Sequence, residues 1–367
     1  MRRRGHFNAI LLLSLLLLSC TSTTVQMRQT KVTPTTTVSL RTLAQARGIS
    51  IGTAVDVQAL ASEAQYRSIL SREFTMVTPE NAMKFAAIRP APNVYSFQDA
   101  DSIVAFAKAH AMQVRGHTLV WYRVIPSWLT NGNFSRAELM GILRDHIMTV
   151  VSHYRSQVNI WDVVNEAIAG DGSLRNSFWL QHIGPDYLDW AFRWAHEANP
   201  QARLFYNDSG GEGSGRKSDA IYTLVKGLLK RGVPISGVGL QMHLSLTTYP
   251  TPHDVLANMN RLAALGLEVQ ITEMDVEIQG AHGTMAEKLS RQAQLYQEML
   301  SICLAAPNCK AFVMWGFTDR HSWIPQSTGH PDAPLIFDED YRPKQAYYGL
   351  IDVLNKASVR LTTLLPL

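Results

Sequence analysis

Two glutamates are the residues of this sequence best placed to do chemistry, because each stands at or near the end of a short apolar run. Glu166 closes the run at residues 161–166 (WDVVNE), and Glu273 lies in the run at residues 271–275 (ITEMD). Hydrolysis of a glycosidic bond requires one carboxylic acid that donates a proton and one carboxylate that attacks the sugar or activates water. The pair therefore indicates glycoside hydrolysis, provided that the fold brings the two carboxyl groups together.

Neighbouring residues assign different roles to the two glutamates. Glu273 and Asp275 are two positions apart, so on a strand their side chains share one face. His243, on the preceding predicted strand, can bridge these carboxylates and hold Glu273 ionised and oriented, as a nucleophile requires. Glu166 has no equally obvious partner and follows an apolar run, which suits a general acid and base. Asn165 beside it can bond a sugar hydroxyl.

Polar or aromatic side chains also stand at the ends of most other predicted strands. Taken singly, each has an ordinary explanation, since a lone histidine or tryptophan more often belongs to the core. Their coincidence at seven strand ends favours one binding pocket. The candidate substrate-binding residues are Glu80, Asn81, Lys84, His117, Trp121, Asn165, Gln241, Trp315 and Trp323. Arg115 and Asp162 lie inside strands, and we interpret them as a structural ion pair.

The elements that position these residues follow a repeating pattern of short apolar runs and longer segments of helical periodicity. Eight apolar runs begin near residues 49, 74, 113, 159, 202, 237, 267 and 310. Eight strands, each followed by a helix, predict a (β/α)8 TIM barrel of the α/β class over residues 39–360. An open doubly wound sheet is the alternative, but the residues after Ile51 do not form the glycine-rich turn that such sheets usually carry.

Start and stop signals mark several of the helices. Ser135 and Glu138 predict a capping box at the start of the helix that follows the third strand. Gly266 predicts the end of the sixth helix. Because barrel active sites lie at the carboxyl ends of the strands, all of the candidate site residues are expected to face one pocket.

Composition excludes several classes of protein. The chain has 367 residues, 46% of them hydrophobic and 17% charged, which is enough for one large core. The net charge is +4, but part of that charge is the three arginines at residues 2–4 rather than a folded face. The sequence has no basic stripe interleaved with aromatics, no HExxH motif and no paired cysteine clusters. We therefore expect no nucleic acid partner, no metal and no cofactor.

The N-terminus predicts export. The arginines precede an apolar run at residues 10–18 that is too short to span a bilayer, and Cys20 follows it. This order resembles a bacterial lipoprotein signal at residues 1–20, with Cys20 lipidated, and an ordinary cleaved signal peptide is the alternative. Residues 21–38, rich in Thr and Ser, are interpreted as a flexible tether. The protein is expected at the cell envelope, attached to the membrane only through this anchor, or otherwise in the periplasm or secreted.

Export also affects the interpretation of the other two cysteines. An oxidising compartment allows Cys303 and Cys309 in CLAAPNC to form a disulfide. Two buried free thiols remain the alternative.

Eight motifs together resemble one known family. In family order and spacing they are TPENAMKF, GHTLVWYRVIPSW, WDVVNEA, LFYNDSG, GVGLQMHLS, ITEMDV, WGFTDRHSW and PLIFDEDYRPKQAYYGL. From about Leu43 to the last predicted helix, the chain resembles glycoside hydrolase family ten, the endo-β-1,4-xylanases. The resemblance implies xylan and xylo-oligosaccharides as substrates, with Glu166 as acid and base and Glu273 as nucleophile of a retaining enzyme.

The resemblance also implies roles for the other candidates. Glu80, Asn81 and Lys84 would bind the sugar one subsite beyond the cleavage point, on the non-reducing side. The subsite in which the bond breaks would be shaped by His117, Trp121, Asn165, Gln241, His243, Trp315 and Trp323. The spacing of Cys303 and Cys309 is similar to that of a disulfide in some members, and we expect a monomer.

Three departures from the family pattern concern substrate binding. The family usually has Trp at Phe85 and His-Ser-Gln at Tyr122, Arg123 and Val124, so a glutamine expected to contact the second sugar is missing. NDSGGE at residues 207–212 replaces the more usual NDYN. These changes leave the catalytic pair intact, but they bear on affinity, on preferred chain length and on tolerance of side branches.

Two other functions compete with this interpretation. A β-1,4-glucanase would need room for the hydroxymethyl group of glucose, which Trp315 and Trp323 would crowd. A surface glycan-binding lipoprotein with little turnover would not need both glutamates together with His243 and Asp275.

Overall fold

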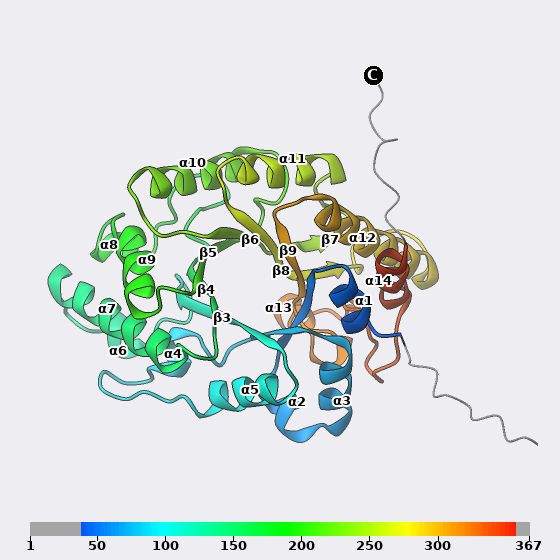
Figure 1. The fold of residues 1–367 in the computed structure, drawn as a ribbon, viewed down its shortest axis with the longest axis horizontal. Helices are drawn as coiled ribbons and strands as arrows, with labels where there is room; N and C mark the ends of the chain where they lie inside the picture. The colour runs from blue at the N-terminus through cyan, green and yellow to red at the C-terminus, as the bar shows by residue number, and fades with distance from the viewer. Residues whose placement is uncertain (1–37, 357–367) are drawn as a thin grey trace, which may run out of the picture. The chain divides into compact units, whose positions relative to one another are not determined.

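The structure, a computed structural model, describes residues 38–356. Within that range eight parallel strands close into a barrel in the order β1-β2-β3-β4-β5-β6-β8-β9, and a short strand, β7, pairs with the end of β8 (Figure 1). The strands are β1 (Ser50–Val55), β2 (Met76–Pro79), β3 (Gln113–Val120), β4 (Ile160–Asn165), β5 (Arg203–Asp208), β6 (Gly237–Leu240), β7 (His243–Ser245), β8 (Glu268–Glu277) and β9 (Cys309–Met314). The predicted (β/α)8 barrel is confirmed, and each of the eight predicted strands is present.

Helices cover the outside of the barrel (Figure 1). The helix α1 (Leu40–Ala46) precedes β1. The helices between successive strands are α2 (Val57–Ser62), α3 (Ala64–Glu73), α4 (Phe85–Ile88), α5 (Gln98–Ala109), α6 (Ser127–Thr130), α7 (Arg136–His153), α8 (Phe178–His182), α9 (Tyr187–Ala198), α10 (Arg216–Lys230), α11 (Pro252–Ala263) and α12 (Met285–Ala305). The 3-10 turn η1 (Asp319–His321) and the helices α13 (Ile324–Thr328) and α14 (Gln345–Asn355) follow β9.

Local signals explain where two of these helices begin and end. The capping box predicted for Ser135 and Glu138 is present at the start of α7. The last residue of α11 is Ala263, and a turn leads from it to Gly266. The N–H of Gly266 donates to the carbonyl of Ala263, and the N–H of Leu267 donates to the carbonyl of Leu262. Gly266 has φ +78°, the left-handed conformation of a glycine that terminates a helix, so the predicted glycine end of the sixth helix is confirmed.

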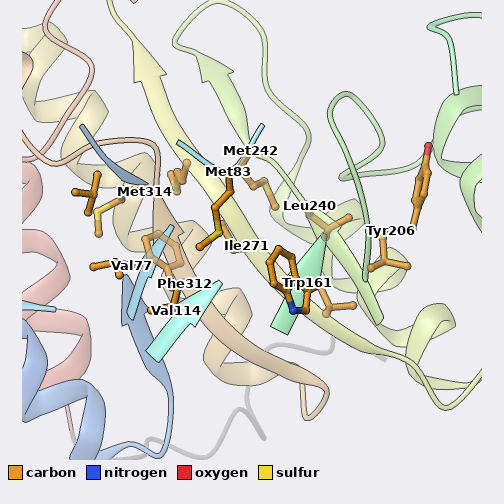
Figure 2. Close-up of a cluster of buried hydrophobic side chains, with 14 of the residues drawn as sticks. Val77, Met83, Val114, Trp161, Tyr206, Leu240, Met242, Ile271, Phe312 and Met314 are labelled. Carbon is orange, nitrogen blue, oxygen red and sulfur yellow. The ribbon is translucent and has the colours of Figure 1, made fainter. Parts of the chain in front are cut away.

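Alternate residues of the strands pack on opposite faces of the barrel wall. Val77 and Phe312 belong to the large apolar cluster shown in Figure 2. Their sequence neighbours Met76 and Val313 belong to a separate small cluster. Since successive side chains of a strand point to opposite faces, the small cluster fills the barrel interior and the large cluster packs against the helices.

A buried ion pair also occupies the barrel interior. The guanidinium of Arg115, on β3, pairs with the carboxylate of Asp162, on β4, and both side chains are buried. Nε of Arg115 donates to Oε1 of Gln270, on β8, over 3.1 Å. Because β3 and β8 are not neighbours in the barrel, this bond crosses the interior. The structural ion pair expected between Arg115 and Asp162 is therefore confirmed.

The remaining sequence features are the last two cysteines and the two ends of the chain. Cys303, in α12, and Cys309, at the start of β9, are joined by a disulfide. The predicted signal with Cys20, the tether up to residue 37 and the last residues of the predicted domain, 357–360, lie outside the described residues. Within residues 38–356, the search for a helix long and apolar enough to cross a membrane finds none.

The buried ion pair gives a prediction for stability. Asp162→Asn leaves the guanidinium of Arg115 buried without its counter-ion, so we expect the free energy of unfolding to fall by about 3 to 5 kcal/mol. Denaturation in guanidinium chloride, followed by circular dichroism, measures this change. The control is Glu197→Gln, which breaks the half-exposed pair between Arg144 and Glu197 and should cost less than about 1 kcal/mol. Equal losses in the two variants would contradict a special role for the interior pair.

Candidate active site

The carboxyl ends of the barrel strands surround a cleft of about 690 Å³. The predicted catalytic and sugar-binding residues that line it are Glu80, Asn81, Lys84, His117, Trp121, Asn165, Glu166, Gln241, His243, Glu273, Trp315 and Trp323. Asp275 does not line the cleft and instead bonds His243 from behind. The structure thus brings together side chains that are up to 243 positions apart in the sequence, as expected for the carboxyl-end face of a barrel.

Glu273 is buried and held by hydrogen bonds from two side chains. Its Oε1 accepts a bond from Nδ2 of Asn207 over 2.6 Å, and its Oε2 accepts one from Nε2 of His243 over 3.2 Å. Burial alone would raise the pKa of Glu273, but the nearby His117 and the charge and hydrogen bond of His243 outweigh it. Together with the bond from Asn207 they lower the pKa to about 2, so Glu273 is ionised at neutral pH.

His243 connects Glu273 to a second carboxylate. Nδ1 of His243 donates to Oδ2 of Asp275 over 2.9 Å, and the same oxygen accepts a bond from Nε1 of Trp323 over 2.8 Å. Burial would lower the pKa of His243, but Asp275 and Glu273 together raise it well above its usual value. The imidazolium therefore donates from both nitrogens and fixes the orientation of the Glu273 carboxylate. This is the bridge expected from the two-residue spacing of Glu273 and Asp275.

Glu166 stands on the opposite side of the cleft in a different environment. Its Oε1 accepts hydrogen bonds from Nδ2 of Asn165 over 3.3 Å and from Nε2 of Gln241 over 3.2 Å. Both partners are neutral amides. The backbone of Glu166 has φ +55°, which is strained for a residue with a side chain. Its N–H donates to the carbonyl of Asn207, and its carbonyl accepts a bond from Nε of Arg175, so neighbouring strands and loops hold the strained residue.

A network of amides links the two glutamates. Nδ2 of Asn207 donates both to Glu273 and, over 2.8 Å, to Oδ1 of Asn165. Nε2 of Gln241 donates to the same oxygen of Asn165 over 3.2 Å and to Glu166. Asn207 is a site residue to which the sequence analysis assigned no role, although it lies near the end of the fifth strand beside other polar residues. Its position at a strand end could have marked Asn207 as a candidate. Its role became clear only from its hydrogen bonds to Glu273 and Asn165.

A basic residue and an acidic residue form the next part of the cleft wall. Nζ of Lys84 donates to Oδ1 of Asn81 over 2.7 Å and lies 5.1 Å from the ring centroid of Trp121. Burial lowers the pKa of Lys84, while Glu273, Glu80 and Glu166 oppose that change. Burial also raises the pKa of Glu80 to about 7, with Lys84 opposing it. These polar groups next to an indole can bond the hydroxyls of a sugar whose ring packs on the aromatic face.

Aromatic rings complete the wall near Glu273. Trp315 lies edge-on to His117, with ring centroids 5.2 Å apart, and edge-on to His243 at 6.3 Å. The ring centroids of Trp323 and His243 are 5.2 Å apart. Nδ1 of His117 bonds Oδ2 of Asp162 over 2.9 Å, so the interior ion pair described above also orients a residue of the cleft.

Further residues line the cleft that the sequence prediction did not assign to it. They are Arg123, Ser209, Gly210, Gln326 and Ser327. Arg123, Ser209 and Gly210 lie in two segments that depart from the family pattern. That departure could have indicated that these segments contact the substrate. Gln326 and Ser327 lie in the short helix α13, for which the sequence offered no signal. Among the described residues, no cluster of three or more His, Cys, Asp or Glu is placed to hold a metal ion.

The arrangement suits a reaction that needs two carboxyl groups in different states. Glu273 is fixed as an ion, while Glu166 faces the same cleft with only neutral amide partners. Environments that separate two carboxyl groups in this way distinguish a nucleophile from a general acid in glycoside hydrolysis.

Comparisons with known proteins agree with this geometry. Endo-1,4-beta-xylanase B of Thermotoga neapolitana is 42% identical over 321 residues, covering 87% of this chain and 92% of that protein. The crystal structure of native xylanase 10B from Thermotoga maritima has 43% identity and a TM-score of 0.84, covering 86% of this chain and 98% of the other. Xylanase 10B from Thermotoga petrophila RKU-1, solved with xylobiose, has the same identity and TM-score, covering 86% and 97%. The model of glycosyl hydrolase family 10 matches residues 39–353, and the chain belongs to that family.

Proposed function

We propose that this protein is an endo-1,4-β-xylanase that hydrolyses internal β-1,4-xylosidic bonds of xylan with retention of the anomeric configuration. The observation that carries the proposal is the pairing of an ionised Glu273, bridged by His243 to Asp275, with Glu166 across the same cleft of a family 10 barrel. Xylan and xylo-oligosaccharides are the substrates.

Glycosylation is the first step. The Glu273 carboxylate attacks the anomeric carbon while Glu166 donates its proton to the glycosidic oxygen, and the leaving chain departs as an alcohol. The product is an ester between Glu273 and the sugar. Asn165 and Asn207, which lie between the two glutamates, are placed to bond a sugar hydroxyl next to the reacting carbon.

Deglycosylation reverses the roles. Glu166, now a carboxylate, removes a proton from water, and the water oxygen attacks the anomeric carbon as the ester bond to Glu273 breaks. Two inversions give net retention. His243 keeps its proton through both steps because Asp275 stabilises the imidazolium, so Glu273 leaves as a hydrogen-bonded carboxylate.

The cleft favours xylose over glucose. Xylose lacks the hydroxymethyl group of glucose, and the indoles of Trp315 and Trp323 occupy the wall beside Glu273. A glucanase needs open space at such a position. A glycan-binding protein without turnover would have no use for a buried carboxylate kept ionised by an imidazolium.

We also propose that the N-terminus exports the protein as a bacterial lipoprotein anchored through Cys20. The arginines at residues 2–4, the apolar run at residues 10–18 and the position of Cys20 support this proposal. The family match begins at residue 39, so this segment lies outside the matched catalytic domain.

Product analysis tests the proposed reaction. We expect proton NMR to detect the β-anomer first when the protein hydrolyses xylohexaose, because two displacements retain the configuration. Glu273→Ala should lower kcat by at least about a thousandfold. Glu268→Ala, at the other end of β8, is the matched control and should stay close to the parent protein. An α-anomer as first product, or faster hydrolysis of cellohexaose than of xylohexaose, would contradict the proposal.

The pH dependence tests the role of His243. We expect a bell-shaped profile of kcat/KM, since Glu273 must be ionised while Glu166 holds a proton. The pKa of Glu273 is about 2, so this carboxylate loses its charge, and the enzyme its activity, only when the pH falls far below the usual 4.5. His243→Gln removes the cationic donor and should move the acid limb to higher pH by about 1 to 3 units.

The acid limb is the diagnostic one because Glu80, with a pKa of about 7, also titrates on the alkaline side. His153→Gln, on the exposed end of α7, is the matched control and should leave the limb unchanged. An acid limb of His243→Gln at the pH of the parent protein would contradict the role given to His243.

The export proposal has its own test. In a bacterial host, the full chain should incorporate labelled palmitate and sediment with membranes, whereas Cys20→Ala should do neither. Cys303→Ala provides the control, because Cys303 is bonded to Cys309 within the barrel domain and offers no site for the lipid. Equal labelling of the parent protein and Cys20→Ala would exclude Cys20 as the anchor.

A further inference from the structure

Two arginines beside the catalytic cleft lie against one tyrosine ring. The guanidinium carbon of Arg123, which lines the cleft, is 5.2 Å from the ring centroid of Tyr122, and its Nε donates to the Tyr122 hydroxyl over 2.6 Å. The guanidinium carbon of Arg175 is 4.3 Å from the same centroid. Arg175 also donates to the carbonyls of Glu166 and Ile168, over 2.8 and 3.1 Å. One ring therefore contacts two guanidinium groups, and one of them, Arg175, is bonded to the backbone of the acid and base residue.

Neither charge has a counter-ion in the part of the chain that the structure describes. No ion pair within residues 38–356 includes Arg123 or Arg175, and both Nη atoms of Arg123 lack a hydrogen-bond partner there. Nearby carboxylates are bound to other residues. Glu166 accepts hydrogen bonds from Asn165 and Gln241. Glu273 is bonded to His243, and Asp208 is paired with Lys217 over 2.9 Å.

This arrangement has the properties of a carboxylate site. A guanidinium presents paired N–H donors that match the two oxygens of a carboxylate, and stacking on an aromatic ring orients it beforehand. A second guanidinium against the same ring adds a repulsion between like charges that a bound anion relieves. Because Arg123 is exposed at the cleft wall while Arg175 is fixed to backbone carbonyls, Arg123 is the residue that reaches the ligand.

We propose that Arg123, supported by Tyr122 and Arg175, binds the carboxylate of an acidic sugar branch of the glucuronic acid class carried by the substrate. The proposal rests on the proposed xylanase function and names the substrate class that the cleft selects. The xylan main chain is neutral, so a uronic acid branch is the group of such a polymer that can supply the anion. Arg123 lines the cleft and is exposed, and the next residue, Val124, is exposed as well, which leaves space for a branch to leave the main chain there.

Binding measurements test the proposal independently of turnover. The probes are xylo-oligosaccharides with one glucuronic acid branch, and the same oligosaccharides after reduction of the carboxyl group to an alcohol. In the Glu273→Ala background, calorimetry should give about three- to fivefold tighter binding of the acidic form at low salt. Adding Arg123→Gln should remove that difference, and Arg123→Lys should retain part of it, because the charge remains without the planar fork.

A matched control separates this site from the general charge of the protein. Arg155→Gln removes the same charge from an exposed residue between α7 and β4, at the end of the barrel opposite the cleft, and should preserve the difference. Equal affinity for the acidic and the reduced oligosaccharides, or an unchanged difference in Arg123→Gln, would overturn the proposal. Turnover of unbranched xylan by the parent protein is measured separately. Its absence would contradict the proposed function without altering the binding result.

Discussion

Keeping one buried carboxylate ionised is the constraint on which the active site depends. Removing a carboxylate from water costs several kcal/mol unless protein groups replace the lost hydration. At Glu273 the replacements are the amide of Asn207 and the imidazolium of His243, whose charge Asp275 stabilises in turn. These residues come from β5, β7 and β8, so the charge is compensated only once the barrel has closed. The fold and the nucleophile are therefore stabilised by the same contacts.

The second glutamate requires the opposite surroundings. Glu166 must release and regain a proton in each cycle, so a cation hydrogen-bonded directly to its carboxylate would hinder it. The structure gives this carboxylate two neutral amides, from Asn165 and Gln241. The strained backbone of Glu166 aims the side chain into the cleft, and the hydrogen bond to the carbonyl of Asn207 helps to hold that conformation. Asn207 thus serves both glutamates, through its side chain at Glu273 and through its backbone at Glu166.

The sequence predicted the parts of the molecule that periodicity and spacing determine. Eight apolar runs predicted the barrel, and the two-residue spacing of Glu273 and Asp275 predicted that His243 could bridge them. Periodicity carries no information about partners across the barrel, so the role of Asn207 required the structure. It also says little about loops, and Arg123, Gln326 and Ser327 line the cleft from segments outside the strands. The glycine at the end of the sixth helix could be predicted because a left-handed residue that terminates a helix depends on local hydrogen bonds and not on partners across the barrel.

The polar interior of the barrel has a catalytic consequence. Apolar residues of similar size in place of Arg115 and Asp162 could fill the interior with equal or greater stability, since buried ion pairs rarely outweigh their loss of hydration. Such an interior would leave Nδ1 of His117 without the Asp162 oxygen that orients it. His117 is one of the residues that lower the pKa of Glu273, and its Nδ1 lies 3.9 Å from Oε1 of that carboxylate. A continuous set of buried polar contacts therefore extends from Arg115 in the barrel interior to Asp275 behind His243, and the ion pair serves the nucleophile through His117.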